Sequence, residues 1–239
     1  MKKIIENSVV LITGADGGIG SALVEELIKR KVKKIYATGT KKENVFKLKE
    51  KAFQIIEPLV LDVTNRENII QCAKVCNDVN ILINNAGVEL KIPFTEKNAQ
   101  KAADFEMKVN YLGVIEMINQ FTPILSKNNK AHIVNIMSLA SVAIIKRLGT
   151  YCASKSATHI LTNTIREEYK QKNIQVVGVY PGYVNTAMVP EEIAYKKTEP
   201  YEIAFEICQD LEMGENNIFP DEMSKNYFSK NPIIINYFE

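Results

Sequence analysis

The sequence predicts an α/β protein with a doubly wound parallel sheet and helices on both faces. Short apolar runs rich in Val and Ile recur along the chain, as in strands buried on both faces of a parallel sheet. Segments with helical periodicity separate these runs, and right-handed crossovers would place such helices on both sides of the sheet. Several runs end in Gly, Asn, Asp or Ser, at the carboxyl edge where such sheets bind ligands.

The first predicted strand spans 8–13 and leads through a glycine-rich turn, 14–20, into a helix that begins near Ser21. The other predicted strands are 34–38, 58–61, 79–83, 132–137 and 174–180, and the other predicted helices are 43–51, 64–76, 99–125, 150–170 and 201–213. Residues 183–199 show little periodicity and are expected to form a substrate loop. The stretch 220–239 has no clear pattern.

Size and charge narrow the function classes. The chain has 239 residues and no linker, so we expect one domain over 1–239. A net charge of +2, from 30 basic and 28 acidic residues, gives no reason to expect nucleic acid or a membrane surface as partner. Four cysteines without a Cys-x-x-Cys pair and two histidines argue against a zinc site. No signal or transmembrane segment is visible, so a cytoplasmic location is expected.

The turn after the first strand has the chemistry of a dinucleotide site. Gly14, Gly18 and Gly20 stand between a strand and a helix, and residues without a Cβ let the backbone approach a pyrophosphate. The pyrophosphate charge would meet the helix N-terminus. The spacing has three residues between the first two glycines, so it differs from the Gly-x-Gly-x-x-Gly form.

Polar residues at other strand ends add to this edge. Asp62 follows the third strand, where it either accepts a hydrogen bond from an adenine amino group or caps a helix near Thr64. The small side chains of 84–87 would let a cofactor pass close by. Asn110 lies inside a long helix, an unfavourable place for an amide, so it is either a buried hydrogen-bonded group or part of a proton path.

The stretch from Ser138 to Lys155 indicates acid–base chemistry. Tyr151 and Lys155 are four residues apart, on one face of the predicted helix. A nearby ammonium lowers the pKa of a phenol, which would let Tyr151 exchange a proton with an alcohol or carbonyl oxygen. Ser138 ends the fifth strand and can donate a hydrogen bond to the same oxygen. The alternative, a half-buried ring beside a solvated charge, is common for such a pair taken alone.

Together these motifs resemble the short-chain dehydrogenase/reductase family over about residues 8–190. The matching motifs, in order, are Thr13–Gly20, Asp62-Val63, Asn84-Asn85-Ala86-Gly87, Asn110, Ser138, Tyr151-x-x-x-Lys155 and Pro181-Gly182 with Thr186. The tail 219–224 also resembles that of bacterial members known only as generic oxidoreductases. The resemblance implies a Rossmann fold of about seven strands and nicotinamide-dependent redox chemistry.

The resemblance also implies roles for individual residues. Tyr151 would be the general acid/base, and Ser138 would orient the substrate. Lys155 would bind the nicotinamide ribose and lower the Tyr151 pKa, while Asn110 would hold a water linking Lys155 to solvent. The implied cofactor contacts are Gly14, Asp16, Gly18, Ile19, Gly20, Thr40, Lys41, Asp62, Val63, Asn85, Ala86, Gly87, Tyr151, Lys155, Pro181, Gly182, Val184 and Thr186.

The end of the second strand favours NADP(H) over NAD(H). It carries no carboxylate to bind a ribose hydroxyl, and Thr40 and Lys41 can bind a 2′-phosphate by hydrogen bond and charge. Alternatively, Lys41 is a solvated lysine at the start of a helix. Gly17 stands where many NADP-dependent members have Arg or Lys, and Asp16 counts against a phosphate if its side chain points that way.

The expected partner is a small carbonyl compound or secondary alcohol. The segments 88–95, 139–148 and 183–199 are expected to face it with an apolar pocket. Its candidate apolar residues are Leu90, Ile92, Phe94, Val142, Ile144, Ile145, Tyr183, Met188 and Val189. The resemblance implies a homodimer or homotetramer formed through the two longest helices. A non-enzymatic NADP(H)-sensing module is the alternative, although such proteins often lack the Tyr or the Lys, and an epimerase would need a longer C-terminal part.

Overall fold

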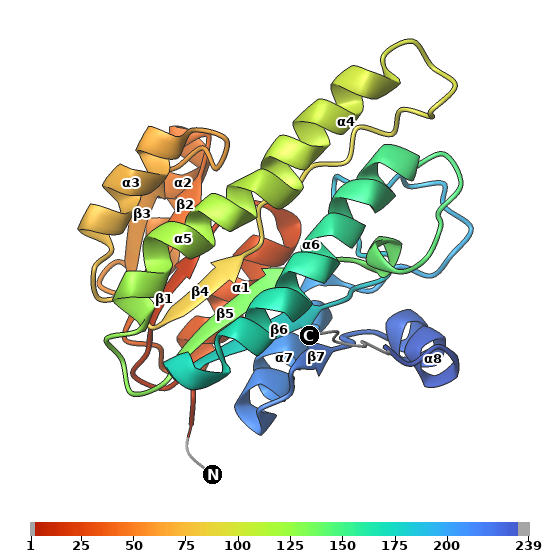
Figure 1. Cartoon of the computed structure of the whole chain (residues 1–239). Coiled ribbons are helices and arrows are strands. Elements are labelled where there is room, and N and C mark those ends of the chain that lie inside the picture. Colours follow the sequence, from red (N-terminus) through yellow and green to blue (C-terminus); the bar gives the residue numbers. More distant parts are fainter. Residues whose placement is uncertain (1–2, 234–239) are drawn as a thin grey trace.

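A computed structural model describes residues 3–233, and the remaining residues of the predicted domain, 1–2 and 234–239, lie outside the described residues. The core is a seven-stranded, fully parallel sheet of order β3-β2-β1-β4-β5-β6-β7 (Figure 1). Its strands are β1 (Val9–Ile12), β2 (Lys34–Gly39), β3 (Ile56–Val60), β4 (Ile81–Asn84), β5 (Ala131–Ile136), β6 (Ile174–Val179) and β7 (Asn217–Ile218). The predicted α/β class is therefore confirmed.

Helices cover both faces of this sheet (Figure 1). They are α1 (Gly18–Lys29), α2 (Lys42–Lys47), α3 (Arg66–Val75), α4 (Ala99–Met107), α5 (Gly113–Leu125), α6 (Gly149–Glu168), α7 (Pro200–Met213) and α8 (Glu222–Lys230). One apolar cluster joins a sheet face to α1 and α7, and a second joins the opposite face to α3, α5 and α6. Most strand residues are apolar and buried because both faces of the sheet are covered.

The strand order places a ligand crevice at one edge. β1 pairs with β2 on one side and with β4 on the other, so the winding direction reverses between β1 and β4. The connections that follow these two strands leave in opposite directions and open a space at the carboxyl ends. The glycine turn follows β1, and the turn that begins at Asn84 closes β4.

The longest predicted helix, 99–125, contains an irregularity that the sequence did not predict. A π-helical turn over Lys108–Leu112 separates α4 from α5, and Asn110 lies at its centre. Such a turn inserts an extra residue and is frequent at functional sites. The predicted helix 43–51 is also divided, because α2 ends at Lys47 and a 3₁₀ turn continues over Leu48–Lys51.

Helix α8 lies in the stretch that showed no clear pattern. Asp221 caps it by accepting a hydrogen bond from Ser224 N at 2.8 Å, and Ser224 Oγ lies 3.3 Å from Asp221 N. Asp221 also accepts from Gly182 N at 2.7 Å, so the helix start is joined to the loop after β6. Within residues 3–233, no helix is both long and apolar enough to cross a membrane.

Candidate active site

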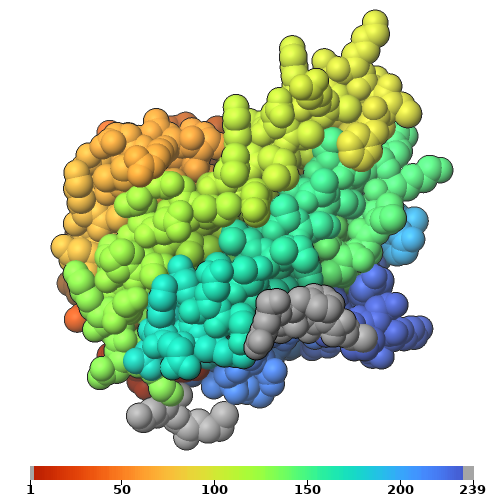
Figure 2. Space-filling view, in the orientation of Figure 1, coloured from red at the N-terminus to blue at the C-terminus, as the bar shows by residue number. Residues whose placement is uncertain are grey.

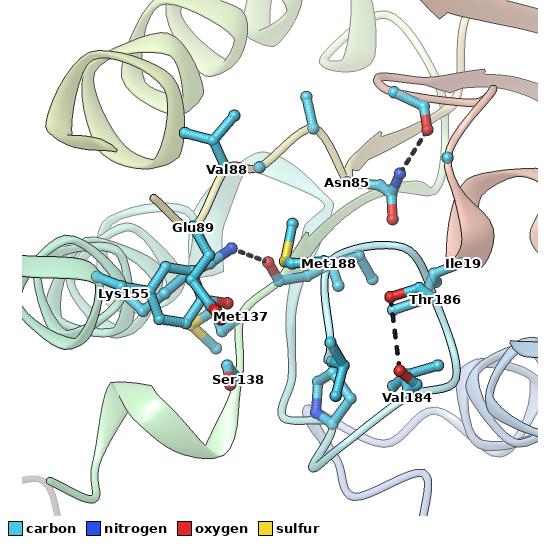
Figure 3. A pocket seen from close by; sticks show the side chains of 18 of the residues that line it. Ile19, Asn85, Val88, Glu89, Met137, Ser138, Lys155, Val184, Thr186 and Met188 are labelled. Atoms are coloured by element: carbon cyan, nitrogen blue, oxygen red, sulfur yellow. Dashed lines mark hydrogen bonds between the residues drawn. The ribbon is translucent and has the colours of Figure 1, made fainter. Parts of the chain in front are cut away.

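A cavity of about 1080 Å³ lies at the carboxyl edge of the sheet and collects most of the predicted site residues. The predicted residues that line it are Gly14, Asp16, Gly18, Ile19, Thr40, Asp62, Val63, Asn85, Ala86, Gly87, Ser138, Tyr151, Lys155, Pro181, Gly182, Val184 and Thr186. Gly20, Lys41 and Asn110 do not line it. Ile19 and Thr186 lie at one end of the cavity, and Glu89, Ser138 and Lys155 lie together at the other (Figure 3).

Three glycines of the turn, Gly14, Gly18 and Gly20, have no room for a side chain. Gly14 has a φ of +61°, in the left-handed region that favours glycine. A Cβ on Gly20 would meet the Gly14 carbonyl oxygen and come within 2.8 Å of Ala15 Cα, and one on Gly18 would meet the Thr186 side chain. Bare backbone therefore faces the cavity where α1 begins, which fits the pyrophosphate of a dinucleotide.

Asn85 fixes the glycine turn against the end of β4. Its amide nitrogen donates to the carbonyl oxygens of Thr13 and Gly14, both at 2.9 Å. In return, Thr13 Oγ1 accepts from the backbone N–H groups of Asn85 and Ala86. The two strand ends that bound the crevice are thus joined by four hydrogen bonds, so the cradle is a fixed surface.

The end of β2 has groups with opposite expected effects on the binding of a 2′-phosphate. The Asp16 carboxylate packs against Gly39, so a Cβ at that glycine would collide with it. Thr40 lines the cavity beside them, whereas Lys41 follows as the residue before α2 and does not line it. Asp16 therefore does point toward the corner where Thr40 and Lys41 were expected to bind a phosphate.

Asp62 does not cap α3, which corrects one alternative from the sequence. Its Oδ1 accepts from Thr64 N at 2.8 Å and from Thr64 Oγ1 at 2.7 Å, closing a local turn. Asn65 is the N-cap, because its Oδ1 accepts from Asn68 N. The turn holds Asp62 on the cavity wall beside Val63.

Ser138, Tyr151 and Lys155 line the other end of the cavity. Ser138 lies two residues after the end of β5, while Tyr151 and Lys155 lie in the first two turns of α6. The Lys155 ammonium is 5.9 Å from the centre of the Tyr151 ring and donates to the Ile136 carbonyl at 3.0 Å. Both side chains are buried, with 7% of Tyr151 and 5% of Lys155 exposed, so bulk water barely reaches them.

Burial controls the pKa values of this cluster. It raises the pKa of Tyr151, the Glu89 carboxylate raises it further, and a hydrogen bond with Ser138 acts in the opposite direction. Burial also lowers the pKa of Lys155 to about 8. Burial is the largest cause of the raised Tyr151 pKa. The expected lowering of that pKa by Lys155 stays a prediction.

Asn110 acts on the loop that follows β4. Its Oδ1 accepts from Val88 N and its Nδ2 donates to Val88 O, both at 2.9 Å. The same Nδ2 donates to Ser154 Oγ at 2.9 Å. Asn110 Oδ1 and Lys155 Nζ also lie against Gly87, each 3.3 Å from where its Cβ would be. The Asn110 side chain is thus a buried, hydrogen-bonded group beside the lysine.

Two acidic residues that the sequence reasoning missed lie beside this cluster. Glu89 lines the cavity, and Glu106 is fully buried, with Oε1 accepting from Leu90 N at 2.8 Å. The available signal was a lone carboxylate inside the otherwise apolar start of the 88–95 segment. The apolar residues expected to face substrate divide as follows: Ile144, Ile145, Tyr183, Met188 and Val189 line the cavity, whereas Leu90, Ile92, Phe94 and Val142 do not.

Comparisons with known proteins agree with this geometry. The family described as short chain dehydrogenase matches residues 8–197. An uncharacterized oxidoreductase of Staphylococcus saprophyticus is 28% identical over 210 residues, which cover 84% of this chain and 89% of the relative.

Two solved structures share the fold. A short chain dehydrogenase from Burkholderia cenocepacia, in complex with NADP, has a TM-score of 0.87 and 31% identity over 94% of this chain and 92% of its own. A short chain dehydrogenase/reductase from Burkholderia phymatum, in complex with NAD, has a TM-score of 0.84 and 21% identity over 96% and 94%. Because the family match spans most of the chain, the protein belongs to the short-chain dehydrogenase/reductase family and is an oxidoreductase of that family.

Proposed function

We propose that the protein transfers a hydride between NADP(H) and a small carbonyl compound or secondary alcohol, with Tyr151 as general acid/base. The observation that carries the proposal is one cavity with bare glycine backbone at one end and Ser138, Tyr151 and Lys155 at the other. A dinucleotide with its pyrophosphate on the glycine turn would extend toward Tyr151. One domain over residues 1–239 would then hold both reactants.

The cofactor, when bound, supplies or accepts the hydride at its nicotinamide ring. Val184 and Thr186 line the cavity where they can contact the nicotinamide carboxamide, with Pro181 and Gly182 beside them. The Lys155 ammonium can bind the adjoining ribose hydroxyls. The fit rests on the turn around Gly14, Gly18 and Gly20, where an added Cβ would collide with Ala86, Thr186 or the Gly14 oxygen and disturb the backbone that faces the cavity.

The chain's own groups would handle the proton. In the reducing direction the Tyr151 hydroxyl donates its proton to the carbonyl oxygen, and Ser138 Oγ donates a hydrogen bond to the same oxygen. A raised pKa keeps Tyr151 protonated at neutral pH, which suits an acid. Lys155, held at Ile136 O, is placed to stabilise the phenolate that forms. The water relay assigned to Asn110 stays a prediction, since its side chain already binds Val88 and Ser154.

The preference for NADP(H) is the finer part of the proposal. Thr40 lines the cavity at the end of β2, and Lys41 follows it with a charge suited to a 2′-phosphate. The 31% identical relative from Burkholderia cenocepacia was solved with NADP. The Asp16 carboxylate beside Gly39 opposes a phosphate, so we expect a modest preference rather than an exclusive one.

The proposed assembly is a homodimer or homotetramer through α4, α5 and α6. These helices form the face seen in Figure 2, where they lie side by side. Large apolar side chains are exposed on them: Phe105 is 44% exposed, Leu112 51% and Ile160 64%. A second copy of the chain would cover these residues.

The test is a fluorescence titration with NADPH and NADH side by side, followed by NADPH oxidation with a panel of small ketones. The proposal predicts tighter binding of NADPH and turnover of at least one ketone. Preference for NADH would overturn the Thr40–Lys41 argument and mean that Asp16 or another group sets the choice. Binding of neither dinucleotide would overturn the proposed function.

A further inference from the structure

The loop that follows β4 is held from two sides by one helix face. Asn110 binds both backbone groups of Val88, and Glu106 accepts from the backbone N–H of Leu90. Glu106 and Asn110 are four residues apart, so both face the loop from adjacent turns. The residue between the two anchored positions is Glu89. Its backbone is therefore fixed, and its side chain enters the cavity from a set position.

Glu89 lies beside the proposed catalytic residues, and its carboxylate forms no ion pair with any described residue. It lies at the same end of the cavity as Ser138 and Lys155 (Figure 3). Its charge raises the pKa values of both Tyr151 and Tyr183, which places the carboxylate within electrostatic reach of the two hydroxyls. No salt bridge or side-chain hydrogen bond joins Glu89 to any other described residue.

The local charge balance favours a cation at this place. Burial raises the pKa of Glu89, the Lys91 charge opposes that rise, and the Glu106 charge adds to it. Glu106 is itself fully buried, and its Oε2 has no partner among residues 3–233. Of the described basic residues only Lys146 and Lys155 line the cavity, the first exposed at the surface and the second bonded to Ile136 O. A cation would stabilise Glu89 in its ionised form.

Two aromatic side chains also line this cavity. Tyr183 and Tyr195 both line the cavity, and their rings stack at 5.3 Å between centroids with 17° between planes. A carboxylate and aromatic rings that line the same cavity can together recognise an ammonium group, by charge and by attraction to the ring faces. The apolar side chains of Met188 and Val189 beside them suit alkyl substituents on such a group.

We propose that Glu89, with Tyr183 and Tyr195, selects carbonyl or alcohol substrates that carry an ammonium group on the carbon adjacent to the reacting carbon. This inference rests on the proposed function, because it names the substrate class of the same site. The cation would sit between the carboxylate and the rings while the reacting oxygen meets Ser138 and Tyr151. Glu106 would be a positioning residue that acts through the backbone of Leu90.

A matched pair of ketones tests this. Trimethylammonioacetone and neopentyl methyl ketone have the same shape and differ by one charge, and levulinate adds an anion. With NADPH, wild-type kcat/KM should favour the ammonium ketone over its neutral analogue, and Glu89→Gln should reduce that ratio about tenfold. Glu96→Gln removes an exposed carboxylate from the same segment and should keep the wild-type ratio. An unchanged ratio in Glu89→Gln, or a wild-type preference for levulinate, would overturn the inference.

Calorimetric binding of trimethylammonioacetone separates this inference from the proposed function. Affinity should fall about tenfold in Glu89→Gln and about threefold in Tyr195→Leu, whose parent side chain is 59% exposed and so is not required for folding. Binding that depends on Glu89 without turnover of any ketone would overturn the proposed function and support the site. Equal affinity in wild type and both variants, or no binding to wild type, would overturn the site whether or not neutral ketones are reduced.

Discussion

The two ends of the cavity are built from different material. At the proposed cofactor end much of the surface is glycine backbone, because Gly14 and Gly18 line the cavity and Asn85 joins the strand ends behind them. At the substrate end the surface is side chains from three separate segments, with Glu89, Tyr183 and Tyr195 among them. A backbone surface permits few substitutions, whereas a side-chain surface can be changed without altering the fold. In the proposed function, the first end would bind the cofactor and the second would select the substrate.

The largest expected effect would break the cofactor end. A Cβ in Gly20→Ala would meet the Gly14 carbonyl oxygen and the Ala15 backbone, neither of which can rotate away. We expect a loss of about 2 kcal/mol in the free energy of unfolding and NADPH affinity at least about tenfold weaker. Denaturant unfolding and fluorescence titration measure both quantities.

Gly17→Ala is the matched control for that change. Gly17 has a φ of −79°, and its added Cβ would lie 3.4 Å from the Gly14 oxygen, an ordinary contact. Its free energy of unfolding should stay within about 0.5 kcal/mol of wild type. Equal loss of stability in both variants would contradict the account of a turn closed by contacts at Gly20.

Removing the Asn110 side chain, which holds the loop after β4, should have the next largest effect. Asn110→Leu leaves the half-buried backbone N–H and C=O of Val88 without their partners. The expected cost is about 2 kcal/mol in unfolding free energy, together with a higher KM, since Glu89 loses its fixed position. Chemical denaturation and steady-state kinetics test this, and wild-type stability in the variant would contradict the anchoring role.

The next effect in size is expected at the end of β2, on the preference between NADPH and NADH. Asp16→Asn removes the negative charge that packs against Gly39 near Thr40. The ratio of NADPH to NADH affinity should rise about fivefold, because repulsion of the 2′-phosphate is lost while the side chain keeps its size. Titration with both dinucleotides measures the ratio. If the ratio stays at the wild-type value, Asp16 does not face the phosphate.

The smallest expected effect concerns pH. The Glu89 charge opposes ionisation of Tyr151 and so raises the Tyr151 pKa. In Glu89→Gln that pKa falls, and the loss of ketone reduction at high pH, where Tyr151 has given up its proton, should begin about half a unit lower. The pH profile of kcat gives the shift, with Glu96→Gln as control. A profile displaced to higher pH would contradict the placement of Glu89.

The cofactor end and the fold could be predicted from the sequence because both have local signals. The glycines between an apolar run and a helix can be recognised from the sequence alone. The same holds for the four-residue spacing from Tyr151 to Lys155. The role of Glu89 depends on Glu106 and Asn110, which are held near it by a π turn that no periodicity indicated. The Tyr151 pKa likewise depends on burial, a property of the packed fold. Helix α8 was not predicted because its stretch of sequence shows no apolar periodicity. Its capping pair, Asp221 and Ser224, is polar and adds nothing to such a pattern.

The most direct test of the central claim is Tyr151→Phe, examined for both ends of the cavity at once. NADPH affinity is measured by fluorescence, and ketone turnover by NADPH oxidation. Since the hydroxyl is the proton donor and the glycine turn is untouched, we expect kcat about 1000-fold lower with NADPH affinity within about threefold of wild type. Retained turnover would contradict the assignment of Tyr151, and a parallel loss of NADPH affinity would contradict the division of the cavity into two ends.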